Sequence, residues 1–354
     1  MTGPLASSLV GRSFDPAALA ARYSAVLILL LIVAGFAIAE PAFLSADTMG
    51  NTVKQASFIG IAAVGMVFVL LTAGIDLSVG SIMYLGPLLA GIAMRDMEVG
   101  VTGALLISVL AGAVMGGINA FFVVVLRIIP FITTLATLFL FRGFGSYLTS
   151  SRQLDFPDEV RGFGLATVFG LPMPVIVFAI IVAAAYVILV HTPLGRQIYA
   201  FGNDAEGARK AGLPTARLQG FVYIASGMCA SLAGFVLISQ IGRLDTGFGE
   251  GREFSVIAAA VLGGASLFGG VGGAFSAVIG ALTIQTVQAG LVYTGINLYL
   301  QPLLLGLVIF IAVLLDGLRQ ARLDDTRRRI IRPFVSAPAS ISSPATKSTK
   351  EPLP

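Results

Sequence analysis

Tryptophan is missing from this 354-residue chain, and cysteine, histidine and charged residues are scarce. One thiol, Cys229, and one imidazole, His191, are too few for a disulfide or for the ligand set of a zinc site. No Gly-x-x-x-x-Gly-Lys-Ser/Thr loop occurs in the sequence, so the chain has no P-loop of its own with which to hydrolyse ATP. These absences argue against an enzyme, and we expect the chain to bind no cofactor or metal.

Hydrophobic residues, in contrast, are abundant. They make up 56% of the chain, and charged residues make up 11%, against about 25% in an ordinary soluble domain. A membrane-spanning helix needs about 20 apolar residues, so the composition predicts an all-α polytopic membrane protein with about ten transmembrane helices. The apolar runs are continuous rather than alternating, which argues against a β-barrel. The candidate spans are residues 24–39, 56–74, 78–94, 99–126, 130–150, 173–190, 218–240, 254–269, 274–292 and 298–316.

The net charge of +4 is unevenly distributed between these spans. Basic residues are common in the loop 192–217 and in the tail 319–354, so the positive-inside rule predicts that this loop and both termini are cytoplasmic. We therefore predict a multi-pass membrane protein, in contact with lipid and not with nucleic acid. Its parts are a cytoplasmic N-terminal segment, 1–22, a transmembrane domain, 23–318, and the tail, which is basic and then disordered.

The loop 192–217 contains a pattern that predicts a helix of about two turns. Asn203 can cap this helix, and Glu206, three residues later, completes a capping box. Gly212 supplies a left-handed stop, and Pro214 prevents continuation. The helix carries both signs of charge, so it is either a solvated loop helix or one that lies in a groove of another protein.

A second unusual segment is Thr72–Gly80, TAGIDLSVG, where an acid lies between glycines at a predicted membrane boundary. Asp76 is either a helix cap in a tight cytoplasmic turn or part of a polar site in a broken helix. Other polar side chains in the spans offer hydrogen bonds either to a passing solute or to a neighbouring helix. With Asp76, the candidates for a translocation path are Ser78, Asn119, Thr133, Thr134, Gln285 and Gln288.

A weak internal similarity relates two of the glycine-rich regions. Phe58–Gly80 and Phe254–Ser276 share apolar and glycine residues at an offset of 196. An inverted or parallel repeat is one explanation, and the chance matching of small apolar residues is the other.

Three motifs together resemble the inner-membrane permease of bacterial ribose/xylose/galactoside-type ABC importers. They are GIDLSVGS at Gly74–Ser81, GNDAEGARKAGL at Gly202–Leu213 and FSVIAAAVLGGASLFGGVGG at Phe254–Gly273, and the similarity extends over residues 25–318. The related nucleoside and branched-chain amino-acid permeases share the loop pattern. They usually differ at the Gly-Ile-Asp-Leu-Ser segment, which here is similar to the sugar branch.

The resemblance implies an ABC importer permease fold and a set of partners. In that family two permeases pair, two cytoplasmic ATPases that use ATP and Mg bind beneath them, and a periplasmic binding protein delivers the sugar. Because this chain has no tryptophan platform, we expect tight sugar recognition to belong to the binding protein. The resemblance assigns ATPase coupling to Gly202, Asn203, Glu206, Ala208, Gly212 and Leu213, and charge adds Asp204, Arg209 and Lys210.

The expected function is thus the transmembrane subunit of an ATP-driven, binding-protein-dependent importer of a monosaccharide. Autoinducer-2 and nucleosides remain open as substrates, as does pairing with an identical or a different permease. A gradient-driven sugar carrier is the main alternative, although the candidate carboxylates lie near predicted span ends. A channel is the second, although no recognisable selectivity filter is present.

Overall fold

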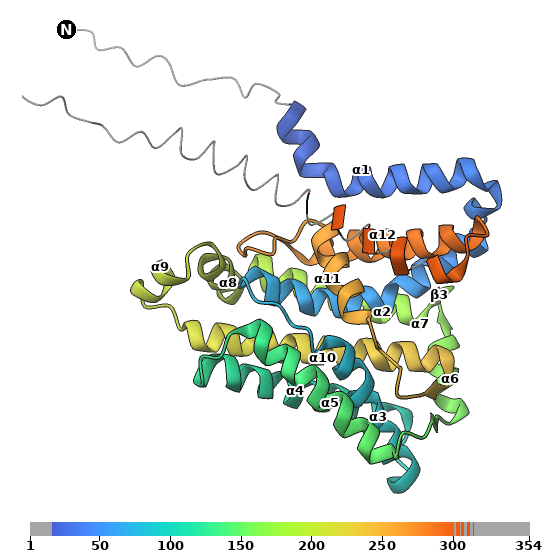
Figure 1. Cartoon of the computed structure of the whole chain (residues 1–354), viewed down its shortest axis with the longest axis horizontal. Helices are drawn as coiled ribbons and strands as arrows, with labels where there is room; N and C mark the ends of the chain where they lie inside the picture. The colour runs from blue at the N-terminus through green and yellow to red at the C-terminus, as the bar shows by residue number, and fades with distance from the viewer. Residues whose placement is uncertain (1–15, 301, 305, 308–309, 312–313, 315–354) are drawn as a thin grey trace, which may run out of the picture. The chain divides into compact units, whose positions relative to one another are not determined.

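The computed structural model describes residues 16–300, 302–304, 306–307, 310–311 and 314, and nearly all of the secondary structure in them is helical (Figure 1). The longer helices are α1 (Pro16–Ala39), α2 (Ala46–Leu71), α3 (Val79–Met97), α4 (Val101–Ala120), α5 (Pro130–Thr149), α7 (Met173–Tyr186), α8 (Pro193–Asn203), α10 (Thr215–Ile241), α11 (Arg252–Leu262) and α12 (Ala274–Tyr293). The shorter ones are η1 (Pro41–Leu44), η2 (Phe121–Val125), α6 (Asp158–Leu165), η3 (Val187–His191), α9 (Ala205–Lys210) and η4 (Leu298–Leu300).

Six stretches of described helix are long and apolar enough to cross a membrane. They are Ala46–Leu71, Val101–Val125, Pro130–Thr149, Met173–His191, Thr215–Ile241 and Ala274–Tyr293, and Ser24–Ala39 is a shorter apolar helix. The protein is therefore a largely helical membrane protein, as the composition predicted. Residues 1–15 of the N-terminal segment and the tail 319–354 lie outside the described residues, and the predicted span 298–316 is described only in part.

One predicted span was wrong in its extent. The apolar segment 254–269 forms only the short helix α11, which ends at Leu262. Gly264 and Gly269 then adopt positive φ angles of 101° and 91°, which residues with a Cβ rarely adopt. The helix therefore gives way to a loop, residues 263–273, before α12 begins.

Helix α10 packs against α2, α3 and α4, and α2 also packs against α7, α11 and α12. Small residues bring α4 and α10 close together: a Cβ on Gly116 would overlap the backbone carbonyl of Tyr223. The hydroxyls of Ser108 on α4 and Ser231 on α10 lie 2.8 Å apart and hydrogen-bond across the same contact. The buried core thus centres on α2 and α10.

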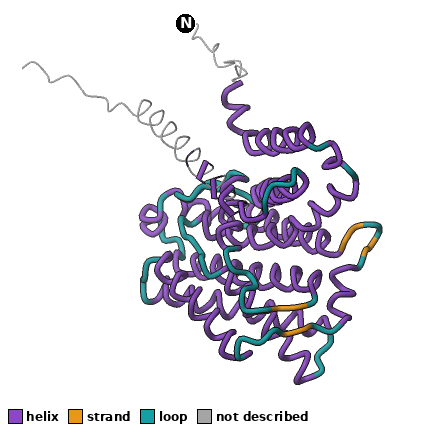
Figure 2. Tube along the Cα trace, turned by 45° about the vertical axis from the view of Figure 1, so that its right-hand side comes forward, coloured by secondary structure: helices purple, strands orange, loops and turns teal. Residues whose placement is uncertain are grey.

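Two short antiparallel strand pairs join loops (Figure 2). They are β1 (Leu154–Asp155) with β4 (Arg243–Leu244), and β2 (Thr167–Val168) with β3 (Leu171–Pro172). In Figure 1, α8 and α9 lie at one end of the bundle, and α6 and β3 lie at the other. The end that carries α8 and α9 is called the coupling end below.

Two helix pairs are interrupted in a similar way. Residues 72–78 separate α2 from α3, and residues 263–273 separate α11 from α12. The offset of 196 carries the bounds of α3 to 275 and 293, close to those of α12, Ala274–Tyr293. These two segments are the first and second helix breaks. The second contacts the residue just before the first, because the backbone N–H of Gly270 donates to the carbonyl oxygen of Leu71, the last residue of α2, at 3.0 Å. The bounds of α3 and α12 thus agree with the internal similarity, whereas those of α2 and α11 do not, because α11 is much shorter than α2.

Helices α4 and α7 both end in a π-helical turn, η2 and η3 respectively. Only Thr192 separates η3 from α8, so the second turn leads directly into the coupling end.

Candidate coupling loop and polar helix break

Helix α9 forms within the charged loop, but its cap is not the predicted one. Asp204 has extended torsion angles (φ −156°, ψ 96°), and its Oδ1 accepts a hydrogen bond from the backbone N–H of Gly207 at 2.8 Å. These are the features of an N-cap residue. Asn203 instead remains helical as the last residue of α8, and its Nδ2 donates to the carbonyl oxygen of Tyr199 at 2.7 Å. The prediction of Asn203 as cap was wrong by one residue.

Glu206 does not complete a capping box. It forms an exposed ion pair with Lys210, four residues later, with 2.8 Å between Oε1 and Nζ. Because the cap is Asp204, Glu206 is the second residue of α9 rather than the third, which moves its carboxylate away from the cap backbone. Gly212 adopts the predicted left-handed conformation, with a φ of 80°.

The candidate coupling residues differ in exposure. Ala208 is buried, and Gly202 and Leu213 are half-buried, so these three face the protein. The exposed ones are Asn203, Asp204, Glu206, Arg209, Lys210 and Gly212. The charges of the loop are thus available to another molecule.

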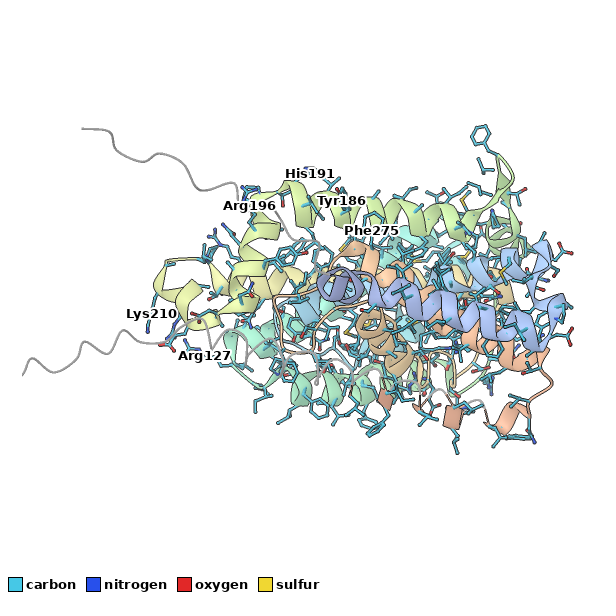
Figure 3. All side chains as sticks on the ribbon, turned by 90° about the horizontal axis from the view of Figure 1, so that it is seen from above. Arg127, Tyr186, His191, Arg196, Lys210 and Phe275 are labelled. Carbon is cyan, nitrogen blue, oxygen red and sulfur yellow. The ribbon has the colours of Figure 1, made fainter. Side chains whose placement is uncertain are left out.

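Basic side chains from several segments gather at the coupling end. Figure 3 places Arg127, from the loop between η2 and α5, at the same end as Arg196 of α8 and Lys210 of α9. His191, the last residue of η3, lies there as well. This clustering agrees with the charge bias from which a cytoplasmic location was predicted.

The coupling end contacts both helix breaks through α8. A Cβ on Gly202 would overlap the carbonyl oxygen of Leu71 and lie 2.6 Å from the backbone nitrogen of Gly270. The hydroxyl of Tyr199 donates to the carbonyl oxygen of Gly272 at 2.8 Å. Burial raises the pKa of Tyr199 above its ordinary value of 10.0, so the hydroxyl keeps its proton at neutral pH. Close backbone approach and one side-chain bond therefore join α8 to the breaks.

Asp76 lies in the first helix break and is fully buried. Its Oδ1 accepts hydrogen bonds from the backbone N–H and the hydroxyl of Ser78, at 3.0 and 2.6 Å. Its Oδ2 accepts a bond from the hydroxyl of Ser226 on α10 at 2.8 Å. Asp76 is therefore not the cap of α3, whose N-cap position is Ser78, and its place in a polar translocation path stays a prediction.

The hydrogen-bond network extends from Ser78 to two more helices. Asn119 on α4 donates through Nδ2 to the Ser78 hydroxyl at 2.8 Å, and its Oδ1 accepts from Thr137 on α5 at 2.7 Å. Thr134 donates to the carbonyl oxygen of Ile75 at 3.1 Å. Thr133 is buried, and its hydroxyl has no hydrogen-bond partner among the described residues. The structure therefore joins four of the predicted path residues, Asp76, Ser78, Asn119 and Thr134, around the first helix break, and Thr133 is the neighbour of Thr134 in α5.

Gln285 and Gln288 do not belong to this group. Both are half-buried on α12. Gln285 lines a separate pocket with residues of α2. The structure thus divides the predicted path residues into two sets.

Sequence reasoning missed several residues of these sites. Ser226, Thr137 and Tyr199 carry no distinguishing signal, because small hydroxyls and single tyrosines are common in membrane helices. Arg142 of α5 donates to the carbonyl oxygens of Thr246 and Phe248 at 2.7 and 3.1 Å. Within the described residues, no group of three or more His, Cys, Asp or Glu side chains is placed to hold a metal ion.

The sequence is similar to known permeases over most of its length. Residues 48–313 match the family described as branched-chain amino acid transport system / permease component. The ribose import permease protein RbsC of Haemophilus influenzae is 35% identical over 82% of this chain and 91% of its own length. RbsC of Escherichia coli K12 is 34% identical over 88% and 98%. The D-allose transport system permease protein AlsC of Escherichia coli K12 is 35% identical over 84% and 92%.

No solved structure matches the chain. The family match covers well over half of the residues, and the relatives align over nearly their full length. The chain belongs to the family of ABC transporter permeases that includes the ribose and allose permeases.

Proposed function

We propose that this chain is the transmembrane subunit of an ATP-driven importer of a monosaccharide in the bacterial inner membrane. In this proposal about ten helices cross the membrane, both termini are cytoplasmic, and a periplasmic binding protein delivers the sugar. The names of the relatives, two ribose permeases and an allose permease, support a monosaccharide as substrate. A further relative, the autoinducer 2 import system permease protein LsrC of Photorhabdus laumondii, is 31% identical. Autoinducer 2 therefore belongs in any substrate screen.

Separate ATPase subunits supply the energy, and the exposed part of α9 is where each of them docks. Glu206, Arg209 and Lys210 offer both signs of charge on a short helix that projects from the bundle (Figure 1). Its buried side, at Ala208, stays in contact with the permease. Charges at the rim of such a contact determine register and specificity more than affinity.

The contact between α8 and the two helix breaks is the observation that carries the proposal. When the ATPases close and move α8 and α9, the bond from Tyr199 to Gly272 and the packing of Gly202 on Leu71 transmit the movement. The first break leads into α3 and contains Asp76, and the second leads into α12. A rigid-body shift of the coupling loop therefore reorients the helices that follow both breaks.

Mass spectrometry of the intact complex, purified through a tag on this chain in mild detergent, tests the subunit composition. We expect two permease chains with two P-loop subunits, and the permease masses distinguish a homodimer from a heterodimer. Uptake of labelled sugar should require ATP and be inhibited by vanadate. Purification without any ATPase, under conditions that keep a known importer intact, would contradict the proposal, as would uptake that an ionophore abolishes and vanadate does not affect.

A further inference from the structure

A polar pocket lies between α2 and α12, at the ends of these helices remote from α8. Its cavity volume is about 190 Å³, and its lining consists of Thr48, Asn51, Thr52, Gln55, Gln285, Ala289 and Tyr293. One water molecule needs about 10–15 Å³ on the same measure, so the pocket has room for a solute much larger than water. It is smaller than the pockets of drug-sized ligands, which measure about 300–1,000 Å³.

The pocket extends into helices that are long enough to cross the membrane. Gln55 is nine residues beyond the start of α2, about 14 Å along the axis, and Gln285 is eight residues before the end of α12, about 12 Å. On α2 the lining residues recur three and four positions apart, which places them on one helix face. The polar lining therefore continues about 12–14 Å along the two helices from the end of the bundle that is remote from α8.

The amides in this pocket differ from its hydroxyls in having no partners. Thr52 donates to the carbonyl oxygen of Thr48 at 2.8 Å, and Thr48 donates to the Tyr293 hydroxyl at 2.5 Å, which joins the two helices at the outer end. The side-chain amides of Asn51, Gln55 and Gln285 form no hydrogen bond to any described residue. Unpaired amides in a membrane-spanning helix are costly against lipid, which indicates that they face water or a hydrophilic solute.

The lining is also uncharged. Amides, hydroxyls, a phenol and one alanine surround the pocket, and among the residues that the structure describes no lysine, arginine or carboxylate contributes to it. An anionic solute or a phosphate head group would be expected to meet a cation, whereas a neutral polyol needs donors and acceptors side by side. Each amide presents both, and Tyr293 adds an aromatic surface of the kind against which a sugar ring packs.

We propose that this pocket is a transient binding site for the neutral monosaccharide after its release from the binding protein, with Gln55 and Gln285 as the main hydrogen-bonding groups. The site rests on the proposed import function, and it adds the first point at which the permease itself contacts the sugar. Asp76 and the first helix break lie beyond the other end of α2, nearer the coupling end than the pocket is.

Uptake measurements on the full importer, with labelled D-ribose and D-allose as probes, test the site. We expect Gln55→Leu and Gln285→Leu each to lower the rate of uptake about fivefold, the loss equivalent to one hydrogen bond. Ala289→Leu, which fills the pocket without removing a polar group, should lower it as well. Gln240→Leu is the matched control, because Gln240 of α10 bonds only to the carbonyl oxygen of Val236 in its own helix.

Protection of an introduced cysteine provides a second, direct readout. In a Cys229→Ala background, Gln285→Cys should react with a hydrophilic methanethiosulfonate, and saturating ribose or allose should slow the reaction severalfold. The sugar should leave the reaction of Gln240→Cys unchanged. This measurement needs only assembled transporter and so separates contact with sugar from loss of folding.

The outcomes separate the two proposals. Failure of the unchanged importer to import any neutral monosaccharide, D-ribose and D-allose included, would overturn the proposed function and this site with it. Normal import by the unchanged importer and by all three pocket variants, with no protection of Gln285→Cys, would overturn the site alone. Loss of a copurified lipid from the variants, with sugar uptake intact, would identify the pocket as a lipid site and also overturn the proposal.

Discussion

The hydroxyl of Ser226 on α10 donates a 2.8 Å hydrogen bond to Oδ2 of Asp76 in the first helix break. The two residues are 150 positions apart in the sequence and both are fully buried. Through this bond the longest described helix holds the loop between α2 and α3 in place. Without it the buried carboxylate would lose one of its three hydrogen-bond donors.

Ser226→Ala should therefore destabilise the permease by about 1–3 kcal/mol, the cost of leaving a buried acceptor short of a donor. Ser239→Ala is the matched control, since Ser239 is buried in the same helix and its hydroxyl bonds only to the carbonyl oxygen of Val236. Heating in detergent with a thiol-reactive dye measures the difference, because Cys229 is the only thiol in the chain. Equal melting temperatures for the two variants would show that the bond to Asp76 contributes nothing.

Gly202→Ala should separate ATP hydrolysis from transport. The added methyl overlaps the carbonyl oxygen of Leu71, and overpacking of this kind typically costs about 1–3 kcal/mol. We expect the complex to assemble and to hydrolyse ATP, while the ratio of sugar imported to ATP hydrolysed in proteoliposomes falls. Gly220→Ala is the control, because nothing lies within 4 Å of a Cβ at Gly220. Unchanged coupling in both variants would remove the packing of α8 on the first break from the mechanism.

Tyr199→Phe should weaken coupling less than Gly202→Ala, because it removes a single hydrogen bond worth about 0.5–1.5 kcal/mol. Burial raises the pKa of Tyr199, so the neutral phenol is favoured in the folded state. Its contribution is then fully present below about pH 10, the ordinary pKa, and is lost only as the pH rises through the higher folded value. Transport per ATP, measured between pH 6 and 8, should show the same deficit in the variant throughout. A deficit that disappears within this range would contradict the assignment.

The charges of Glu206 and Lys210 should matter for ATPase docking rather than for the stability of α9. Exposed pairs of this type contribute little to folding. Glu206→Gln should retain much of the transport, whereas Glu206→Lys should lower it strongly and reduce the ATPase recovered with the permease. The exchange Glu206→Lys with Lys210→Glu restores an ion pair within the helix but reverses both charges. If the exchange restores transport, the pair acts within the helix and not on a partner.

Hydropathy located most of the membrane helices, since α2, α4, α5, α7, α10 and α12 each overlap a predicted span. It failed at 254–269, because an apolar run does not reveal where glycines with positive φ end a helix. It correctly placed Asp76 between two helix ends, but it gave no sign that the residue is fully buried. The apolar character of a segment thus predicts its insertion into the membrane but not the continuity of its helix.

The local details of the sites were less predictable. Asn203 and Asp204 are both good cap residues, and only the backbone torsion angles, which depend on how α8 packs, select Asp204. The bond between Asp76 and Ser226 was beyond sequence reasoning, because nothing local to Ser226 distinguishes it from the other serines of α10. Gly202 was recognised through a motif, but the reason for a glycine there became evident only from its contact with Leu71.

The π-helical turn η3, Val187–His191, lies between a membrane-spanning helix and α8. Its hydrogen-bonded rings enclose one residue more than those of an α-helix. A return to α-helical bonding would displace the register by one residue and rotate everything beyond it by about 100°. The helical phase with which the coupling loop leaves its membrane helix is therefore determined by the one extra residue in this turn.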